Sequence, residues 1–207
     1  LHVLVSCDRI NASFREVVMG VSADSWIKRR QISVDDYHRM GEIGLIGPDE
    51  RVELIEGEII DMAPIGSDHA SFVNRLTSLL INAVQDKGIV SVQNPVRLSN
   101  QTEPEPDFAV LKPRADFYQR QLPTATDTLL IVEVSNTSER YDREVKLPLY
   151  ATYGVPEVWL ISLEQKTLSI YQTPTGDRYQ HEQTTDGPGM VSLFALPEVS
   201  VDLSPLF

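Results

Sequence analysis

Two acidic residues stand in apolar segments that predict strands. Glu133 interrupts TLLIVEVS (128–135), and Asp107 opens DFAVL (107–111) directly after a proline. Near-continuous apolar residues are typical of a buried strand, and an ionised carboxylate inside it needs a cation, a metal or a proton. Glu133 is therefore either a strand-end carboxylate paired with Lys or Arg, or a metal ligand. The sequence around it leaves both interpretations open.

Lys146 is the third residue with a possible chemical role. On a solvent-exposed helical face it would pair weakly with Asp142, four residues earlier. Alternatively, the short connection after Ser135 brings the next helix, and Lys146 with it, close to the end of the strand that carries Glu133. Pro148 favours a late helix start or a kink, because proline is tolerated in a first helical turn and disruptive later.

Two carboxylates and one ammonium at a shared cleft would suit phosphodiester hydrolysis with a divalent metal. Hard oxygen ligands bind Mg²⁺ or Mn²⁺ and leave positions open for water and phosphate. The metal activates water and neutralises developing charge, and the ammonium orients the nucleophile.

The remaining pattern predicts the elements that must position these groups. Ser33, with Asp36 three residues later, predicts a capped helix that ends at Gly41 or Gly44. The other expected elements are a hairpin over 51–63 with its turn at Glu56-Gly57, a long helix over 68–86 capped by Ser67 or Asp68 and ended by Gly88, strands over 89–98, 107–111, 128–135, 155–162 and 166–172, a helix over 138–154, and short β segments after it.

This order predicts one α/β (α+β) domain with a mixed sheet over residues 32–207, preceded by a tail or arm over residues 1–31. Trp159, Tyr150 and Tyr153 are expected in the core rather than against nucleic-acid bases.

The bulk composition is that of an ordinary globular protein. The chain has 207 residues, 42% of them hydrophobic, and contains a single cysteine, which excludes an intrachain disulfide and suits a cytoplasmic location. No apolar run reaches the roughly 18–20 residues of a membrane span, so a membrane partner is not expected. The net charge of −12 argues against broad attraction to nucleic acid, although metal-binding carboxylates would shift the balance in the same direction.

The acidic motifs resemble those of a known nuclease superfamily. Pro106-Asp107, followed by Glu133 at the end of an apolar strand, resembles the PD-(D/E)xK, restriction-endonuclease-like superfamily. The sequence departs from it at Ser135, where that pattern has its lysine. More closely, the chain resembles a bacterial family of Uma-type endonucleases from about residue 33 to its C-terminus, in VELIEGEIIDMAP, SDHASFVNRL, EPEPDFAV, LLIVEVSNTSERYDREVKLPLYATYGVPEVWLIS and VSVDL.

This resemblance implies a central mixed β-sheet flanked by helices and a site for Mg²⁺ or Mn²⁺. It assigns metal binding to Asp107, Glu133 and Val134, and it places the displaced lysine on the following helix, at Lys146.

A further acidic residue of such sites comes from the first helix, but the matching helix over 68–86 contains no glutamate. The hairpin offers Glu53 and Glu58 instead, and Glu58 is the preferred candidate. His69 could contact phosphate or position water, although a capping or solvent-exposed histidine is the more common case.

The implied function is a metal-dependent endonuclease that hydrolyses DNA. A homodimer is expected, because two-fold dimers are the commonest oligomers and suit enzymes that cut both strands. The alternative is a catalytically inactive relative that serves as a nucleic-acid-binding or assembly module. A two-carboxylate glycosidase is a weaker alternative, since nothing in the sequence suggests a sugar-binding cleft.

Overall fold

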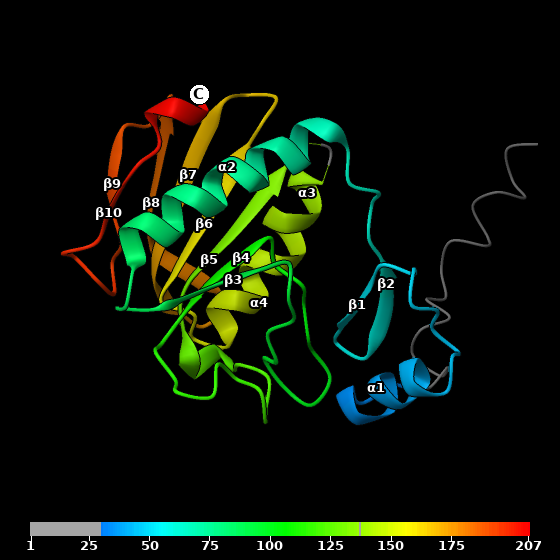
Figure 1. Ribbon diagram of the computed structural model, residues 1–207. Coiled ribbons are helices and arrows are strands. Elements are labelled where there is room, and N and C mark those ends of the chain that lie inside the picture. Colours follow the sequence, from blue (N-terminus) through cyan, green and yellow to red (C-terminus); the bar gives the residue numbers. More distant parts are fainter. Residues whose placement is uncertain (1–29, 137) are drawn as a thin grey trace, which may run out of the picture. The chain divides into compact units, whose positions relative to one another are not determined.

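Figure 1 shows the computed structural model of the chain, which describes residues 30–136 and 138–207. Residues 31–207 form one compact unit. The expected tail or arm over residues 1–31 falls almost entirely outside the described residues. None of the helices in the described part of the chain has the length and apolar character that a membrane crossing requires.

The described elements follow one another in this order: α1 (Val34–Glu42), β1 (Val52–Ile55), β2 (Glu58–Asp61), α2 (Ser67–Val84), β3 (Ile89–Val92), β4 (Phe108–Leu111), η2 (Ala125–Asp127), β5 (Thr128–Ser135), α3 (Glu139–Tyr141), η3 (Asp142–Lys146), α4 (Leu147–Thr152), β6 (Glu157–Ser162), β7 (Thr167–Thr175), β8 (Arg178–Asp186), β9 (Met190–Ser192), β10 (Ser200–Asp202) and η4 (Ser204–Leu206).

A mixed sheet of six strands, ordered β3-β4-β5-β6-β7-β8, forms the centre of the fold and confirms the predicted fold class. In this sheet β5 and β6 run parallel, and the other neighbouring strands run antiparallel. Phe108 on β4 pairs with Val132 on β5. Asp107 precedes Phe108 and Glu133 follows Val132, so in this antiparallel pair the two acids face each other at the same end.

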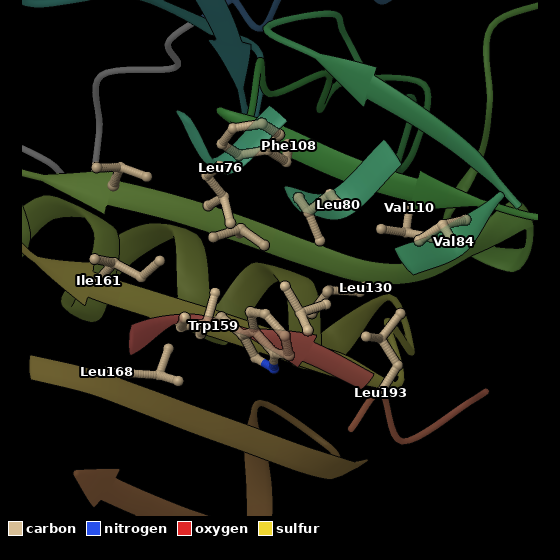
Figure 2. Packing of buried hydrophobic residues seen from close by; sticks show 14 of the residues in the cluster. Leu76, Leu80, Val84, Phe108, Val110, Leu130, Trp159, Ile161, Leu168 and Leu193 are labelled. Atoms are coloured by element: carbon tan, nitrogen blue, oxygen red, sulfur yellow. The ribbon is translucent and has the colours of Figure 1, made fainter. Parts of the chain in front are cut away.

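Helices cover both faces of the sheet (Figure 1). On one face, Leu76 and Leu80 of α2 pack with Leu130 and Trp159, as Figure 2 shows. On the other face, Tyr150 of α4 packs in a second apolar cluster, whose strand residues include Ala109, Ile131 and Leu160. Because side chains alternate along β5, Glu133 shares the face of Ile131 and points to the side that α3 and α4 cover.

Several element boundaries differ from the sequence prediction. The cap of α1 at Ser33 is confirmed, but the N-cap of α2 is Gly66, which has no side chain to cap with. That helix also ends before Gln85, where the backbone turns to a φ of 51°. The strand expected over 89–98 stops at Val92, because Gln93 adopts a left-handed conformation with a φ of 50°.

The helix expected over 138–154 is interrupted by the π-helical turn η3. In this turn the backbone N–H of Leu147 donates to the carbonyl of Asp142, five residues earlier. Pro148 follows immediately and can donate no backbone hydrogen bond, which accounts for an irregular helix at this point. Lys146 is the last residue of the turn, so this local irregularity sets the direction of its side chain.

Leu80→Ala tests whether the α2 face is the core. We expect the variant to lose about 2–5 kcal/mol of unfolding free energy, because Leu80 is fully buried and its truncation leaves a cavity. The neighbouring Ile81 is 53% exposed, and Ile81→Ala should change the value by about 0.5 kcal/mol or less. Urea unfolding followed by tryptophan fluorescence measures both. Equal losses in the two variants would contradict the packing in Figure 2.

Candidate active site

A pocket of about 470 Å³ lies where β4 begins and β5 ends. It is lined by the three residues that the sequence analysis predicted to form a site, Asp107, Glu133 and Lys146. Glu53 and His69 line it as well, and so does Asp142. The three groups therefore converge from two strands and one helical turn, as the sequence analysis expected.

Glu133 is buried and makes close contacts with the helix that follows it. Its Oε1 accepts hydrogen bonds from Lys146 Nζ at 3.2 Å and from the Tyr150 hydroxyl at 2.6 Å. Its Oε2 has one long contact, 3.4 Å, with the backbone N–H of Asp107. Burial raises the pKa of Glu133 to about 8, although the ammonium of Lys146 opposes this rise. Glu133 is thus paired with a lysine and also lines a pocket, so the two initial interpretations are compatible.

Lys146 is held between two carboxylates. Its Nζ lies 3.1 Å from Glu53 Oε2 and 3.2 Å from Glu133 Oε1, and its side chain is 5% exposed. Burial alone would lower the pKa of Lys146, but the negative charges of Glu133 and Glu53 outweigh burial and raise it. The alternative of a solvent-exposed lysine paired weakly with Asp142 is therefore wrong.

The acidic residue that the hairpin contributes to the pocket is Glu53. Its Oε1 accepts a hydrogen bond from the Tyr141 hydroxyl at 3.1 Å, and its Oε2 accepts one from the backbone N–H of Glu105 at 3.1 Å. It is 1% exposed. These contacts fix both oxygens of the carboxylate beside Lys146.

Glu58, the preferred candidate from the sequence, is exposed and is not among the residues that line the pocket. Glu53 pairs with Ile60, whereas Glu58 pairs with Ile55 beside the turn. The pair that contains Glu58 therefore lies two residues further along the hairpin than the pair that contains Glu53, a shift of roughly 7 Å. The preference for Glu58 is corrected on this ground: position along the hairpin, which the sequence pattern did not resolve, decides which glutamate reaches the pocket.

Asp107 is fixed by three hydrogen-bond donors. Its Oδ2 accepts from the backbone N–H of Val134 at 2.9 Å and lies 3.1 Å from His69 Nε2. Its Oδ1 accepts from Gln93 Nε2 at 3.1 Å. Burial alone would raise the pKa of Asp107, but these donors, with His69 the strongest, lower it. Asp107 is therefore a carboxylate at neutral pH.

His69 neither caps α2 nor points to solvent. Its side chain is 15% exposed and contacts Asp107. A carboxylate only accepts hydrogen bonds, so this contact assigns a proton to Nε2. The other ring nitrogen, Nδ1, is buried and has no hydrogen-bond partner among the described residues. His69 thus orients Asp107 from the opposite face of the sheet to Lys146.

Ser135, where the superfamily pattern has its lysine, contacts Asp142 instead. The hydroxyls of Ser135 and Ser138 donate to Asp142 Oδ2 at 2.5 and 2.9 Å, and Asp142 is 4% exposed. Burial raises the pKa of Asp142, and Lys146 is the main opposing influence. At this position β5 therefore carries a buried hydroxyl that is hydrogen-bonded to Asp142, and Asp142 in turn lines the pocket.

Sequence reasoning assigned no functional role to Tyr150, Tyr141 or Asp142. Asp142 and Tyr150 stand four residues before and after Lys146, a spacing that puts all three on one helical side. That spacing was the available signal. Tyr150 is in the core, as expected, but its hydroxyl also contacts Glu133. Nothing in the sequence pointed to Gln93.

The donor set fits a hard divalent cation. The carboxylates of Asp107 and Glu133 supply oxygens, and Val134, whose side chain is apolar, can supply only its backbone carbonyl. In residues 30–136 and 138–207, no three His, Cys, Asp or Glu side chains form a metal-binding group. A cation would therefore complete its coordination with water or phosphate oxygens, as Mg²⁺ commonly does in proteins.

Comparisons with known proteins agree with this fold. A crystal structure described as a putative nuclease from Anabaena variabilis superposes with a TM-score of 0.65; it is 17% identical and the match covers 85% of this chain and 97% of that one. A comparison with curated proteins gave no match. Residues 34–204 match the family Uma2, described as "Putative restriction endonuclease". The chain therefore belongs to the Uma2 family, as its sequence motifs predicted.

Proposed function

We propose that this chain is a Mg²⁺- or Mn²⁺-dependent endonuclease that hydrolyses phosphodiester bonds in DNA. The observation that carries the proposal is the convergence of Asp107, Glu133 and Lys146 on one pocket. The family description, "Putative restriction endonuclease", supports DNA as the substrate. Dimerisation would give two such pockets, one for each strand of a duplex.

The roles follow from the environment of each group. Asp107, Glu133 and the carbonyl of Val134 would hold the cation, which would supply Lewis acidity and positive charge at the phosphoryl group. Asp107 is ready for this role because its donors keep it ionised. Lys146, kept as an ammonium, orients the attacking water and stabilises negative charge on the phosphate.

Glu53 and Tyr150 act through their neighbours in this scheme. Glu53 holds the ammonium of Lys146 from the side of the hairpin, and Tyr150 holds the carboxylate of Glu133 from α4. Preorganised charges of this kind stabilise a transition state without reorganising during the reaction.

A second candidate function rests on one observation. The charged groups of the site already have hydrogen-bond partners, as in a purely structural network. Asp107 accepts a hydrogen bond from the backbone of Val134, and Lys146 is paired with Glu133 and Glu53. The same fold could then be a binding or assembly module. Calorimetry discriminates between the two: a nuclease binds Mg²⁺ or Mn²⁺ with heat that is lost in Glu133→Gln, and a module does not.

Asp107→Asn tests the proposed hydrolysis. We expect wild-type protein with Mg²⁺ or Mn²⁺ to nick supercoiled plasmid DNA, and the variant to be slower by about 100-fold or more, because the metal loses a charged ligand. Asp86→Asn, at an exposed position in the turn that follows α2, is the matched control and should cut normally. Absence of any wild-type cleavage with either ion would reject the proposal.

Glu53→Gln and Glu58→Gln test which hairpin glutamate contributes. The change at Glu53 weakens one of the two ion pairs of Lys146, so we expect cleavage to fall by about 10- to 100-fold. Glu58→Gln removes an exposed charge of the same type and should leave the rate unchanged. Plasmid nicking rates measure both. The opposite ranking would restore Glu58 as the contributing residue.

Lys146→Met tests the buried ion pairs. Without the ammonium, Glu53 and Glu133 are buried with no cation beside them, and we expect a loss of about 3–5 kcal/mol in unfolding free energy. Urea unfolding measures this loss. Lys87→Met, at a 41%-exposed lysine 3.8 Å from Glu198, should have an effect of less than about 1 kcal/mol.

The deficit of Lys146→Met should also grow with pH. When the pKa of a carboxyl group is higher in the folded state than in the unfolded state, the free energy of unfolding falls as the pH rises from the unfolded-state pKa to the folded-state pKa. In the wild type this loss through Glu133 ends near its folded pKa of about 8. In the variant the pKa of Glu133 lies higher still, so the loss continues. The deficit should therefore be larger at about pH 9.5 than at about pH 7, and a deficit that is the same at both would contradict the pairing.

A further inference from the structure

Arg51 is a cation on the wall of an acidic pocket. It stands directly before β1 and lines the same pocket as the candidate catalytic residues. Among the described residues, the pocket is lined by one arginine, Arg51, and one lysine, Lys146. The acidic residues that line it are Glu53, Asp61, Glu105, Asp107, Glu133 and Asp142. A nucleic-acid phosphate that enters this pocket therefore meets mostly negative charge.

The two cations differ in how the protein uses them. Lys146 is almost completely buried and is committed to two ion pairs. Arg51 is half-buried, and its Nη1 donates to the backbone carbonyl of Ala63 at 3.1 Å. Within residues 30–136 and 138–207, no carboxylate lies at ion-pair distance from its guanidinium. Since a guanidinium carries five N–H donors, most of its hydrogen-bonding capacity is left for another acceptor.

The position of Arg51 brings its charge to bear on the pocket. Arg51 lines the pocket together with Glu105 and Asp107, so its positive charge lies at the wall of the same pocket as these carboxyl groups. A structural role as a tether is already filled, because the backbone N–H of Met62 donates to the carbonyl of Arg51 at 2.9 Å and joins the same two segments. The guanidinium is thus not needed to close the hairpin.

We propose that Arg51 binds a backbone phosphate of the nucleic-acid substrate and holds the strand against the candidate catalytic residues. The inference rests on the proposed function and adds to it a substrate-binding residue outside the set of Asp107, Glu133 and Lys146. A planar guanidinium can bind two phosphate oxygens at once, whereas a lysine acts as a point charge. In a pocket with few free cations, loss of this contact should weaken substrate binding more than it slows the chemical step.

Arg51→Met tests the contact through binding. Fluorescence anisotropy with a labelled DNA duplex in EDTA measures affinity without metal-dependent hydrolysis, over a series of salt concentrations. We expect affinity to fall about tenfold or more, and the slope of log affinity against log salt to become shallower by about 1. Arg51→Lys should keep the slope and recover part of the affinity. Arg178→Met, at an exposed arginine on β8 that does not line the pocket, should match the wild type.

Steady-state cleavage with Mn²⁺ separates binding from chemistry. For Arg51→Met we expect the loss in kcat/KM to appear mainly as a higher KM, with the melting temperature little changed. A lowered melting temperature with an unchanged salt slope would overturn the inference, because it would make Arg51 a structural residue. Wild-type cleavage combined with unchanged KM and salt slope in the variant would also overturn it and leave the proposed function standing. If the wild type neither cuts nor binds DNA, both fall.

Discussion

The site depends on one buried ammonium that bridges two carboxylates from different parts of the chain. Lys146 contacts Glu53 on the β1–β2 hairpin and Glu133 on the central strand β5. None of these charges would be stable alone in an interior of low dielectric constant. Together they attach the hairpin, which belongs to a separate two-stranded sheet, to the end of the six-stranded sheet. The electrostatic requirement to pair these groups thus also fixes the geometry of the pocket.

The two sides of the sheet supply different chemistry to the same pair of acids. From α2, His69 donates to Asp107, and together with Val134 it favours the ionised form. From the other face, Lys146 and Tyr150 contact Glu133, whose burial favours the protonated form. The two acids therefore differ in their tendency to hold a proton: hydrogen-bond donors outweigh burial at Asp107, whereas burial outweighs Lys146 and Tyr150 at Glu133.

The fold and part of the site could be predicted from the sequence because their signals are local. The apolar run around Glu133, the proline before Asp107 and the family motifs fixed which strands carry the acids. The choice of Glu53 over Glu58 could not be predicted, since it depends on how far along a hairpin each residue stands. The direction of the Lys146 side chain and the hydroxyl contact of Tyr150 depend on a π-helical turn, and the spacing of apolar residues in the sequence does not predict such a turn. Gln93 reaches Asp107 from a strand end with a left-handed backbone, again a feature of the fold rather than of the sequence.

The antiparallel register of β4 and β5 has a consequence for how this chain can tolerate changes in length. The segment from residue 112 to 127 joins the two strands at the end opposite to the acids, so residues added to or removed from it need not alter the distance between Asp107 and Glu133. One residue inserted within either strand would instead shift an acid along the ladder and turn its side chain to the other face. Length variation should therefore be permitted in this connection and forbidden in the short strands beside it.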